Sequence, residues 1–448
     1  MKLIKVFLEN LEIAIKDHFT NKVKEIFCKL RSEKGGVLIS NFFSLSILQL
    51  ANFIFPLIII PHLLSVLGIE IFGLLAFATA TINYFSILGD YGFNLTATRE
   101  VSIHRGSKEK LTEIYSSVMT IKFLLLLLGF IVLVLLTTFF DKFSQDYLLY
   151  YYTYGIVFGK FLFPVWFFQG MEKMKYISIL NIIAKSIFLI AIFVLVNEKD
   201  DFYLVPVFNS LGFIIAGFIA LFYIHKKFEI SFKIQSKEIL LFYLKDGWHI
   251  FISRVAVLLY TSNNIIILGL LTNNTSVGFY SVAEKVTSAI SSLGSIINRV
   301  IFPHLSEVWI RDKKNYHRQF VSVIKPLIIT MLFISLILFI ASPYIISFLS
   351  GGKQINESIT VLKILSIAVL LFPLGSIFTQ SFVTQNKNNL VTKVTLYTTL
   401  INLILVLILV YKFDFYGLAY AVVCVQFFQT LLNFKYFVQL KKKILCAD

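Results

Sequence analysis

The chain has 448 residues, of which 57% are hydrophobic, 15% are charged and 47 are phenylalanine, and its formal net charge is +16. A water-soluble domain cannot bury that share of apolar side chains, so the composition excludes one. Together with a mean hydropathy of +0.81, it predicts an all-α, polytopic membrane protein whose solvent is lipid.

Residues 1–36 are charged and lack the apolar stretch of a cleaved signal peptide. One helical face of this segment carries apolar side chains at Ile4, Leu8, Leu11, Ile15 and Phe19. The spacing predicts an amphipathic helix on the cytoplasmic leaflet, and a partly disordered tail is the alternative.

Twelve apolar stretches follow, each long enough for a helix that crosses a hydrocarbon core about 30 Å thick. They are residues 37–64, 71–96, 115–139, 147–170, 177–196, 203–225, 246–271, 277–303, 322–350, 359–385, 391–411 and 416–437. Polar residues interrupt the apolar character of the seventh and eighth stretches. We therefore predict twelve transmembrane helices, with most polar side chains concentrated on a few of them.

Positive charge is distributed unevenly among the loops between these stretches. If both termini are cytoplasmic, the cytoplasmic segments and their edges carry 30 Lys or Arg residues, and the external segments carry 4. Short loops rich in Lys and Arg stay on the cytoplasmic side, so we predict that both termini are cytoplasmic. The same asymmetry accounts for the net charge, and we expect no nucleic-acid binding.

No loop is long enough to form a separate domain, and we predict five parts. They are an N-terminal segment at 1–36, a first lobe of helices 1–6 at 37–225, a cytoplasmic linker at 226–245, a second lobe of helices 7–12 at 246–437, and a basic tail at 438–448. Shifting the sequence by 205 positions places Gly73 on Gly278 and Gly89 on Gly294. The lobes are therefore predicted to be parallel repeats, related by an axis along the membrane normal.

Seven cationic residues lie four or more positions inside the ends of the apolar stretches, and each costs about 2.5–3.5 kcal/mol near a bilayer centre. They are Lys122, Lys160, Lys185, Arg254, Lys285, Arg299 and Lys363. Arg254 and Lys285 lie about 12 Å from the predicted helix ends, too deep to reach the headgroups easily. An anionic ligand, or an internal ion pair with Asp90 or Glu284, would compensate their charge.

The other intramembrane cations are less informative. Arg299 lies nearer the cytoplasmic face, where it either contacts a ligand or extends to the headgroups. We expect Lys122 and Lys363, which lie near helix ends, to reach the headgroup layer. Lys160 and Lys185 lie deeper, and their position indicates the interior of the first lobe.

Polar side chains form corresponding stripes on the second and eighth stretches. The eighth carries them every three or four residues, on one helical face, at Ser281, Lys285, Ser288, Ser292, Ser295 and Arg299. The second carries Thr79, Asn83, Ser86, Asp90 and Asn94 at corresponding places. Interhelical hydrogen bonding alone explains any single serine. Combined with the cations, however, the stripes predict a central cationic cavity lined by helices 1, 2, 7 and 8.

Motifs for catalysis are missing from the sequence. It contains no phosphate-binding loop, no Cys-x-x-Cys pair and no His-Glu-x-x-His run, and its histidines lack metal-ligand spacing. Glu198, Asp200 and Asp201 cluster on an external turn, where a solvated loop explains them better than the metal site of a glycosyltransferase. We expect no enzyme activity, metal or cofactor, apart from coupling to protons or sodium through Glu284 or Asp90.

Four short motifs resemble those of bacterial O-antigen and capsular polysaccharide repeat-unit flippases, in the multidrug/oligosaccharidyl-lipid/polysaccharide exporter superfamily. They are EIFG at 70–73, DYGF at 90–93 followed by Arg99 and Glu100, WFFQGME at 166–172, and VGFY at 277–280 followed by Glu284 and Lys285. The resemblance covers residues 37 to about 440. It implies two six-helix lobes around a cationic cavity, and transport of oligosaccharide linked to undecaprenyl diphosphate across the bacterial inner membrane by alternating access.

This resemblance implies roles for the polar residues already singled out. Arg254, Lys285, Arg299 and Arg99 are the candidates for contact with the diphosphate, the last two where the substrate enters. Asn52, Asn83, Tyr260, Asn264 and Ser288 are the candidates that face sugars. The expected partners are the lipid-linked oligosaccharide, membrane lipid, and a polysaccharide polymerase with its chain-length regulator.

Two other functions remain open. A cation-coupled exporter of drugs or small molecules would have the same architecture, but it should offer acidic groups to cationic substrates. An integral membrane polysaccharide polymerase or glycosyltransferase would normally have a long external loop with catalytic residues, and every external loop here is shorter than about ten residues.

Overall fold

The computed structural model describes residues 33–261 and 263–445. Every regular element in these two ranges is a helix, which confirms the predicted all-α class. The amphipathic helix predicted within residues 1–36 lies almost wholly outside the described residues.

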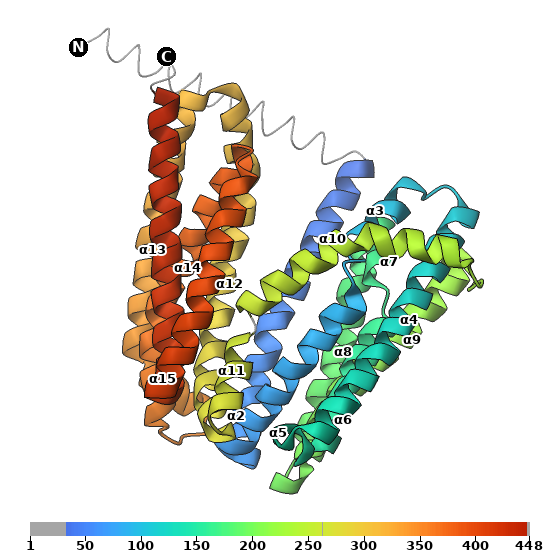
Figure 1. The fold of residues 1–448 in the computed structure, drawn as a ribbon, viewed down its shortest axis with the longest axis horizontal. Helices are drawn as coiled ribbons and strands as arrows, with labels where there is room; N and C mark the ends of the chain where they lie inside the picture. The colour runs from blue at the N-terminus through green and yellow to red at the C-terminus, as the bar shows by residue number, and fades with distance from the viewer. Residues whose placement is uncertain (1–32, 262, 446–448) are drawn as a thin grey trace.

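Two helical bundles, joined by a pair of helices, make up the described part of the chain (Figure 1). The first bundle consists of α2 (Glu33–Asp90), α3 (Thr96–Ile103), α4 (Lys108–Phe139), α5 (Asp141–Ser144), α6 (Tyr147–Leu162), α7 (Val165–Gly170), α8 (Met174–Leu195), the short 3-10 helix η1 (Lys199–Tyr203) and α9 (Leu204–Phe228). The joining helices are α10 (Lys237–Thr261) and α11 (Asn263–Leu271). The second bundle consists of α12 (Asn274–Arg311), α13 (Lys313–Leu349), α14 (Asn356–Thr384) and α15 (Asn388–Leu445).

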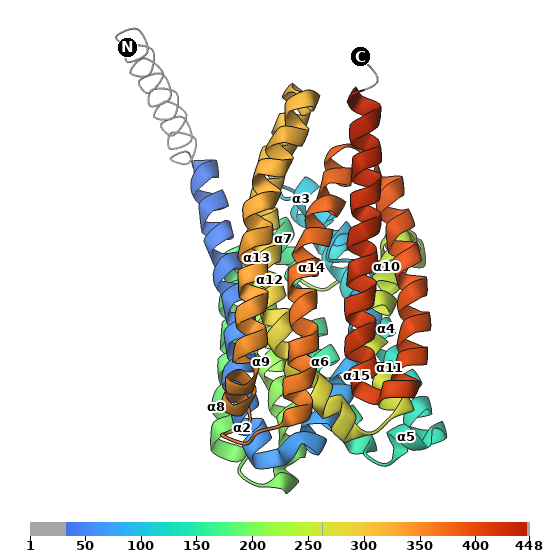
Figure 2. The same ribbon diagram turned by 90° about the vertical axis from the view of Figure 1, so that its left-hand side faces the viewer.

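The two bundles form a V. They approach each other at one end of the molecule and diverge toward the end at which α2 begins and α15 ends (Figure 1). Figure 2 shows the long helices of the second bundle extending side by side toward that same end.

Eight helices in the described residues are long and apolar enough to cross a membrane, and the chain is a multi-pass membrane protein. These helices cover nine of the twelve predicted stretches, because Asn388–Lys442 contains the last two. The predicted stretch 147–170 is divided between α6 and α7, and 246–271 is divided between α10 and α11. The third uncovered stretch, 277–303, belongs to α12 and carries the polar stripe. Twelve crossings therefore stay a prediction.

Large apolar side chains on the outside of both bundles remain exposed. Phe222 is 66% exposed, Phe333 is 63% exposed and Ile340 is 64% exposed. Apolar surface of this extent would associate in water, whereas the hydrocarbon of a bilayer can cover it.

Two pairs of predicted helices are joined by sharp kinks instead of loops. α2 continues through Gly68, whose φ is 80°, and α15 continues through Asp414, whose φ is 53°. A positive φ costs glycine little, because it has no Cβ. Asp414 accepts a hydrogen bond of 2.8 Å from the hydroxyl of Ser276, which ties the second kink to the start of α12.

The bundles are in direct backbone contact where α2 crosses α12. A Cβ atom added to Gly73 would lie 1.8 Å from the backbone oxygen of Asn274 and 2.6 Å from the backbone nitrogen of Gly278. One added to Gly278 would lie 2.2 Å from the backbone oxygen of Ile69. Gly73 and Gly278 are the residues that the 205-residue shift makes equivalent. The parallel repeat itself stays a prediction.

The helix that follows the predicted linker lies across the first bundle (Figure 1). Phe251 of α10 stacks on Tyr91, with ring centroids 4.8 Å apart. Gly92 has a φ of +82°, and a Cβ there would lie 2.7 Å from the side chain of Ile250. Glycine thus permits both the turn after α2 and the close approach of α10. α10, which contains residue 246, thus contacts the first bundle. The start of the second lobe at residue 246 stays a prediction.

We predict that Gly73→Ala destabilises the contact between the bundles. Its methyl group would meet a backbone oxygen that cannot move independently of α12, and overpacking of this kind costs about 1–3 kcal/mol. The protein purified in detergent should unfold at a lower temperature. Gly106→Ala is the matched control, because a Cβ at Gly106 meets nothing within 4 Å. An unchanged unfolding temperature for Gly73→Ala would contradict the close crossing.

Candidate functional site

Two neighbouring cavities lie inside the molecule. The interbundle cavity has a volume of about 660 Å³ and is lined by α2, α8, α9, α11, α12, α14 and α15. The first-bundle cavity has a volume of about 430 Å³ and is lined by α2, α4 and α6 to α10. Asn83 lines the former and Ser86 the latter, and these residues are about one turn apart on α2.

The interbundle cavity collects several of the polar residues predicted from the sequence. Asn83 reaches it from α2 and Asn264 from α11, while α12 contributes Glu284, Lys285 and Ser288. Glu284 and Ser288 are four residues apart, so they share the cavity-facing side of α12. Of the stripe predicted on the eighth stretch, Lys285, Ser288 and Ser292 therefore line this cavity.

Lys285 is only loosely paired with its neighbouring carboxylate. Its Nζ lies 3.8 Å from Oε2 of Glu284, which is too long for a hydrogen bond, and its side chain is 46% exposed. Ser288 donates a hydrogen bond of 2.5 Å to Oε1 of Glu284, while the buried Oε2 has no hydrogen-bond partner. The Lys285 ammonium is thus available to an anion in the cavity.

Three amide side chains in this cavity were missed at the level of sequence. Asn209 of α9, Asn402 and Gln426 of α15 join its lining, and Nδ2 of Asn402 donates a hydrogen bond of 3.1 Å to Oδ1 of Asn264. Each amide interrupts an apolar stretch, where lipid offers no hydrogen-bond partner. An amide inside an apolar stretch could therefore have marked these residues as candidates. The sequence alone, however, does not tell which cavity the amide faces.

Three further site residues predicted from the sequence line the first-bundle cavity. Arg254 reaches it from α10, whereas Asn52 and Asp90 reach it from the two halves of α2. Arg254 and Lys285, which the sequence places together in one central cavity, therefore line separate but neighbouring cavities.

Three lysines also line the first-bundle cavity. Lys122 comes from α4, Lys160 from α6 and Lys185 from α8. The predicted interior position of Lys160 and Lys185 agrees with this placement. The expectation that Lys122 reaches the headgroup layer is wrong, because its side chain is buried at 6% exposure. α4 begins at Lys108 instead of residue 115, so Lys122 lies about 21 Å along the helix instead of about 10 Å.

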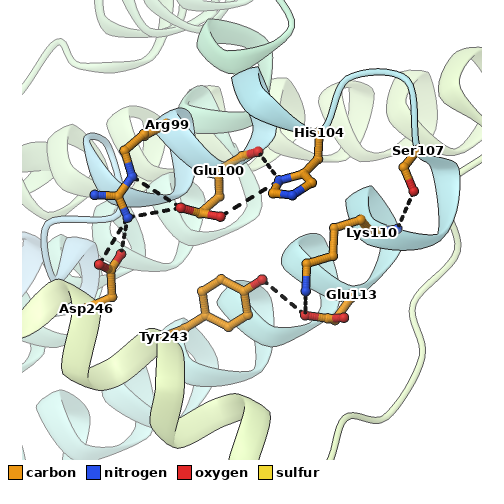
Figure 3. A network of polar contacts seen from close by, with 8 residues as sticks. All are labelled: Arg99, Glu100, His104, Ser107, Lys110, Glu113, Tyr243 and Asp246. Carbon is orange, nitrogen blue, oxygen red and sulfur yellow. Dashed lines mark hydrogen bonds and ion pairs between the residues drawn. The ribbon is translucent and has the colours of Figure 1, made fainter.

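Arg99 lies in neither cavity. It is on α3 with its side chain 55% exposed, and its Nη2 lies 3.1 Å from both carboxylate oxygens of Asp246 on α10 (Figure 3). Hydrogen bonds to Glu100 and to Asp246 raise the pKa of Arg99 above its ordinary value. Nearby, the hydroxyl of Tyr243 on α10 donates a hydrogen bond of 3.2 Å to Glu113 on α4. These contacts hold α10 against the first bundle, at the surface.

Two candidate residues are not placed. Tyr260 belongs to α10 and Arg299 to α12, and their side chains lie outside the part of the chain that the structure describes. Within that part, no group of three or more His, Cys, Asp or Glu residues is arranged to hold a metal ion.

Comparison with known proteins identifies the family. Residues 38–309 match the family described as polysaccharide biosynthesis protein, and the chain belongs to that family. Over 411 residues it is 29% identical to "Putative O-antigen transporter" of Escherichia coli (strain K12), a match that covers 91% of this chain and 98% of that protein. The family resemblance inferred from the four sequence motifs is confirmed.

The fold is shared with solved membrane transporters. The lipid II flippase MurJ, in an inward closed conformation, matches with a TM-score of 0.71 and 16% identity, over 90% of this chain and 87% of that one. An inward-facing multidrug resistance transporter of the MATE family matches with a TM-score of 0.70 and 14% identity, over 88% of this chain and 96% of that one. At such identities these matches establish the architecture alone, and they confirm the predicted fold class.

The lining of the interbundle cavity should be accessible to water. In a cysteine-free background, Asn83→Cys and Ser288→Cys should react with a charged, membrane-impermeant thiol reagent in vesicles opened to both sides. Phe333→Cys should react much more slowly, because its exposed side chain faces lipid, where a thiolate does not form. Labelling Phe333→Cys as fast as the two cavity variants would show that the polar stripe does not face water.

Proposed function

We propose that this protein is a flippase for oligosaccharide repeat units linked to undecaprenyl diphosphate. It would move them from the inner to the outer leaflet of the bacterial cytoplasmic membrane, for O-antigen or a related surface polysaccharide. The observation that carries this proposal is that cations and amides line two neighbouring cavities within a membrane-spanning helical fold. The family match and the similarity to a protein named as an O-antigen transporter support it.

The chemistry of such a substrate fits the two cavities. A diphosphate and its sugars lose their hydration in hydrocarbon, and burying them without partners is prohibitive. Arg254 and Lys285 offer charge-assisted hydrogen bonds to phosphate oxygens, while Asn83, Asn264 and Ser288 can donate to and accept from sugar hydroxyls. The prenyl chain needs no such site, because it is soluble in the surrounding lipid.

The V shape of the two bundles suggests the side from which the substrate would be loaded. The uneven distribution of Lys and Arg in the loops predicts that both termini are cytoplasmic, and in that orientation the bundles would diverge toward the leaflet in which the substrate is made. Among the solved structures with this fold, one is described as inward-facing, one as inward closed and one as outward-facing. Rocking of the bundles about the crossing of α2 and α12 would then open the opposite side.

A drug exporter of the same architecture fits the charges less well. The first-bundle cavity holds four cations and one carboxylate, an arrangement that repels cationic substrates. The curated relative is named as a transporter and the solved structure as a flippase. Both names support the proposal that this protein is not an enzyme.

Coupling and partnership belong to the same proposal. Glu284 and Asp90 are the carboxylates that face the two cavities, and they are our candidates for coupling transport to protons or sodium. The polysaccharide polymerase and its chain-length regulator would act on the delivered units at the outer face of the membrane.

We predict that Arg254→Ala and Lys285→Ala each slow export of repeat units about tenfold or more, since each removes a charge-assisted contact. The variants should be tested in a strain that lacks its own repeat-unit transporter but makes a matching unit. Surface polysaccharide is measured on gels, and the amount of inserted protein is measured in parallel.

Lys363→Ala is the matched control, because this lysine belongs to an apolar stretch but its Nζ lies over the ring of Phe339, 5.7 Å from the centroid. It should support normal polysaccharide. Normal polysaccharide from both cavity variants, at normal protein levels, would remove Arg254 and Lys285 from the site.

A further inference from the structure

α10 packs on the core of the first bundle, although the predicted second lobe begins within this helix. Tyr243 of α10 is buried in one apolar cluster with Trp166 and Phe167 of the first bundle. Phe251 of α10 stacks on Tyr91, which belongs to the same cluster. The apolar cluster of the second bundle is built from residues of α12 to α15. In this conformation, α10 is therefore attached to the first bundle by its apolar face.

The predicted repeat gives α10 a counterpart that is attached differently. The 205-residue shift places residue 254 on residue 49, so α10 corresponds to the part of α2 before Gly68. That part lies along α8 of its own bundle, where Ser178 donates a hydrogen bond of 2.6 Å to the backbone oxygen of Ser44. α10 instead lies across the other bundle (Figure 1). The repeat thus predicts a second place for α10, along the second bundle.

α10 and α11 link the two bundles. α10 ends at Thr261 and α11 begins at Asn263. On α11, Asn264 accepts a hydrogen bond of 3.1 Å from Nδ2 of Asn402 on α15. This pair of helices is joined to the first bundle through α10 and to the second bundle through α11. A change in the angle between the bundles must therefore either bend the pair or release one of its attachments.

One ion pair closes the attachment of α10 at the surface. Nη2 of Arg99 on α3 lies 3.1 Å from both carboxylate oxygens of Asp246 on α10 (Figure 3). Nε and Nη2 of Arg99 also donate hydrogen bonds of 3.2 and 3.0 Å to Glu100, which orients the guanidinium. The side chain of Arg99 is 55% exposed and that of Asp246 is 24% exposed. A pair exposed to this extent can break and form again, since water replaces the partners at little cost.

The ion pair and the apolar contacts differ in what they specify. Burial of apolar surface is not directional, so the apolar face of α10 can be covered along either bundle. The contact of Arg99 with Asp246 exists only where α10 lies against α3. A weak but specific contact can therefore decide between two places that are otherwise nearly balanced.

We propose that Arg99 and Asp246 form an ionic latch, which keeps α10 on the first bundle while the bundles diverge toward the ends of α2 and α15. The latch opens, and α10 leaves α3, when the protein opens on the opposite side. The inference rests on alternating access in the proposed function, but it concerns two residues that line neither cavity.

The latch is tested by the side from which the interbundle cavity can be reached. In a cysteine-free background, Asn83→Cys is the reporter, and a membrane-impermeant thiol reagent is added to one side of oriented vesicles at a time. The readout is the ratio of labelling from the external side to labelling from the predicted cytoplasmic side. Arg99→Ala and Asp246→Ala should each raise this ratio about two- to fivefold, the change that loss of an exposed ion pair makes in a two-state equilibrium.

Charge exchange separates a latch from damage to the fold. Arg99→Asp and Asp246→Arg should each raise the ratio, and the double variant should return close to wild type, because the attraction is restored in reverse. Arg105→Ala is the matched control. Arg105 forms an ion pair of 2.8 Å with Glu172, and both residues belong to the first bundle, so the ratio should not change. An equal ratio in Arg99→Ala and Arg105→Ala, or a double variant as far from wild type as the single ones, would overturn the latch.

Salt provides a measurement that does not depend on the folding of a variant. Exposed charges are screened as the ionic strength rises. More salt should therefore raise the labelling ratio of the otherwise unchanged reporter protein, in the same direction as Arg99→Ala. A ratio that does not respond to salt would also overturn the latch.

The outcomes distinguish the latch from the proposed function, because the labelling needs no substrate. If the latch variants shift the ratio but the wild-type chain restores surface polysaccharide with no matching repeat unit, the function is wrong and the latch stands. If the wild-type chain restores polysaccharide and the ratio does not respond to the variants, only the latch is wrong.

Discussion

The architecture depends on the crossing of α2 and α12, where two glycines let the backbones of the two bundles touch. At Gly73 a single methyl group would lie 1.8 Å from a carbonyl oxygen, so no other residue fits without moving a helix. Gly73 and Gly278 are also the residues that the predicted internal repeat makes equivalent, which would put this contact on the axis between the repeats. Bundles joined closely at this point can diverge elsewhere, and Figure 1 shows that they do so toward the ends of α2 and α15.

Charge placement follows from the same framework. Helices that diverge leave space, and polar side chains that would be costly in lipid are directed into it. The interbundle cavity receives the amides and hydroxyls from both bundles together with the Lys285 and Glu284 pair. The first-bundle cavity receives a cluster of cations with too few carboxylates. A substrate with an anionic diphosphate attached to sugars matches these two environments better than a cationic drug does.

Much of this organisation could be predicted from the sequence, because lipid imposes strict rules on composition and loop charge. The polar stripe of α12 follows directly from its periodicity, and Asn83 and Ser288 reach one cavity as the stripes predict. The depth of Lys122 could not be predicted, because hydropathy does not detect the polar first turns by which α4 extends to Lys108. The separation of Arg254 from Lys285 could not be predicted either, because it depends on α10 lying across the first bundle. That position is held by contacts between distant parts of the sequence, such as the ion pair of Arg99 with Asp246.

The most direct test of the central claim is a translocation measurement with purified components. The protein is reconstituted into vesicles that carry a fluorescent oligosaccharide on a polyprenyl diphosphate in the inner leaflet, and appearance of the sugar outside is followed with a membrane-impermeant quencher. The account predicts that quenching is much faster in these vesicles than in protein-free vesicles, and that the same sugar on a lipid without phosphate is not moved. Equal rates with and without protein, or equal transport of the uncharged lipid, would contradict it.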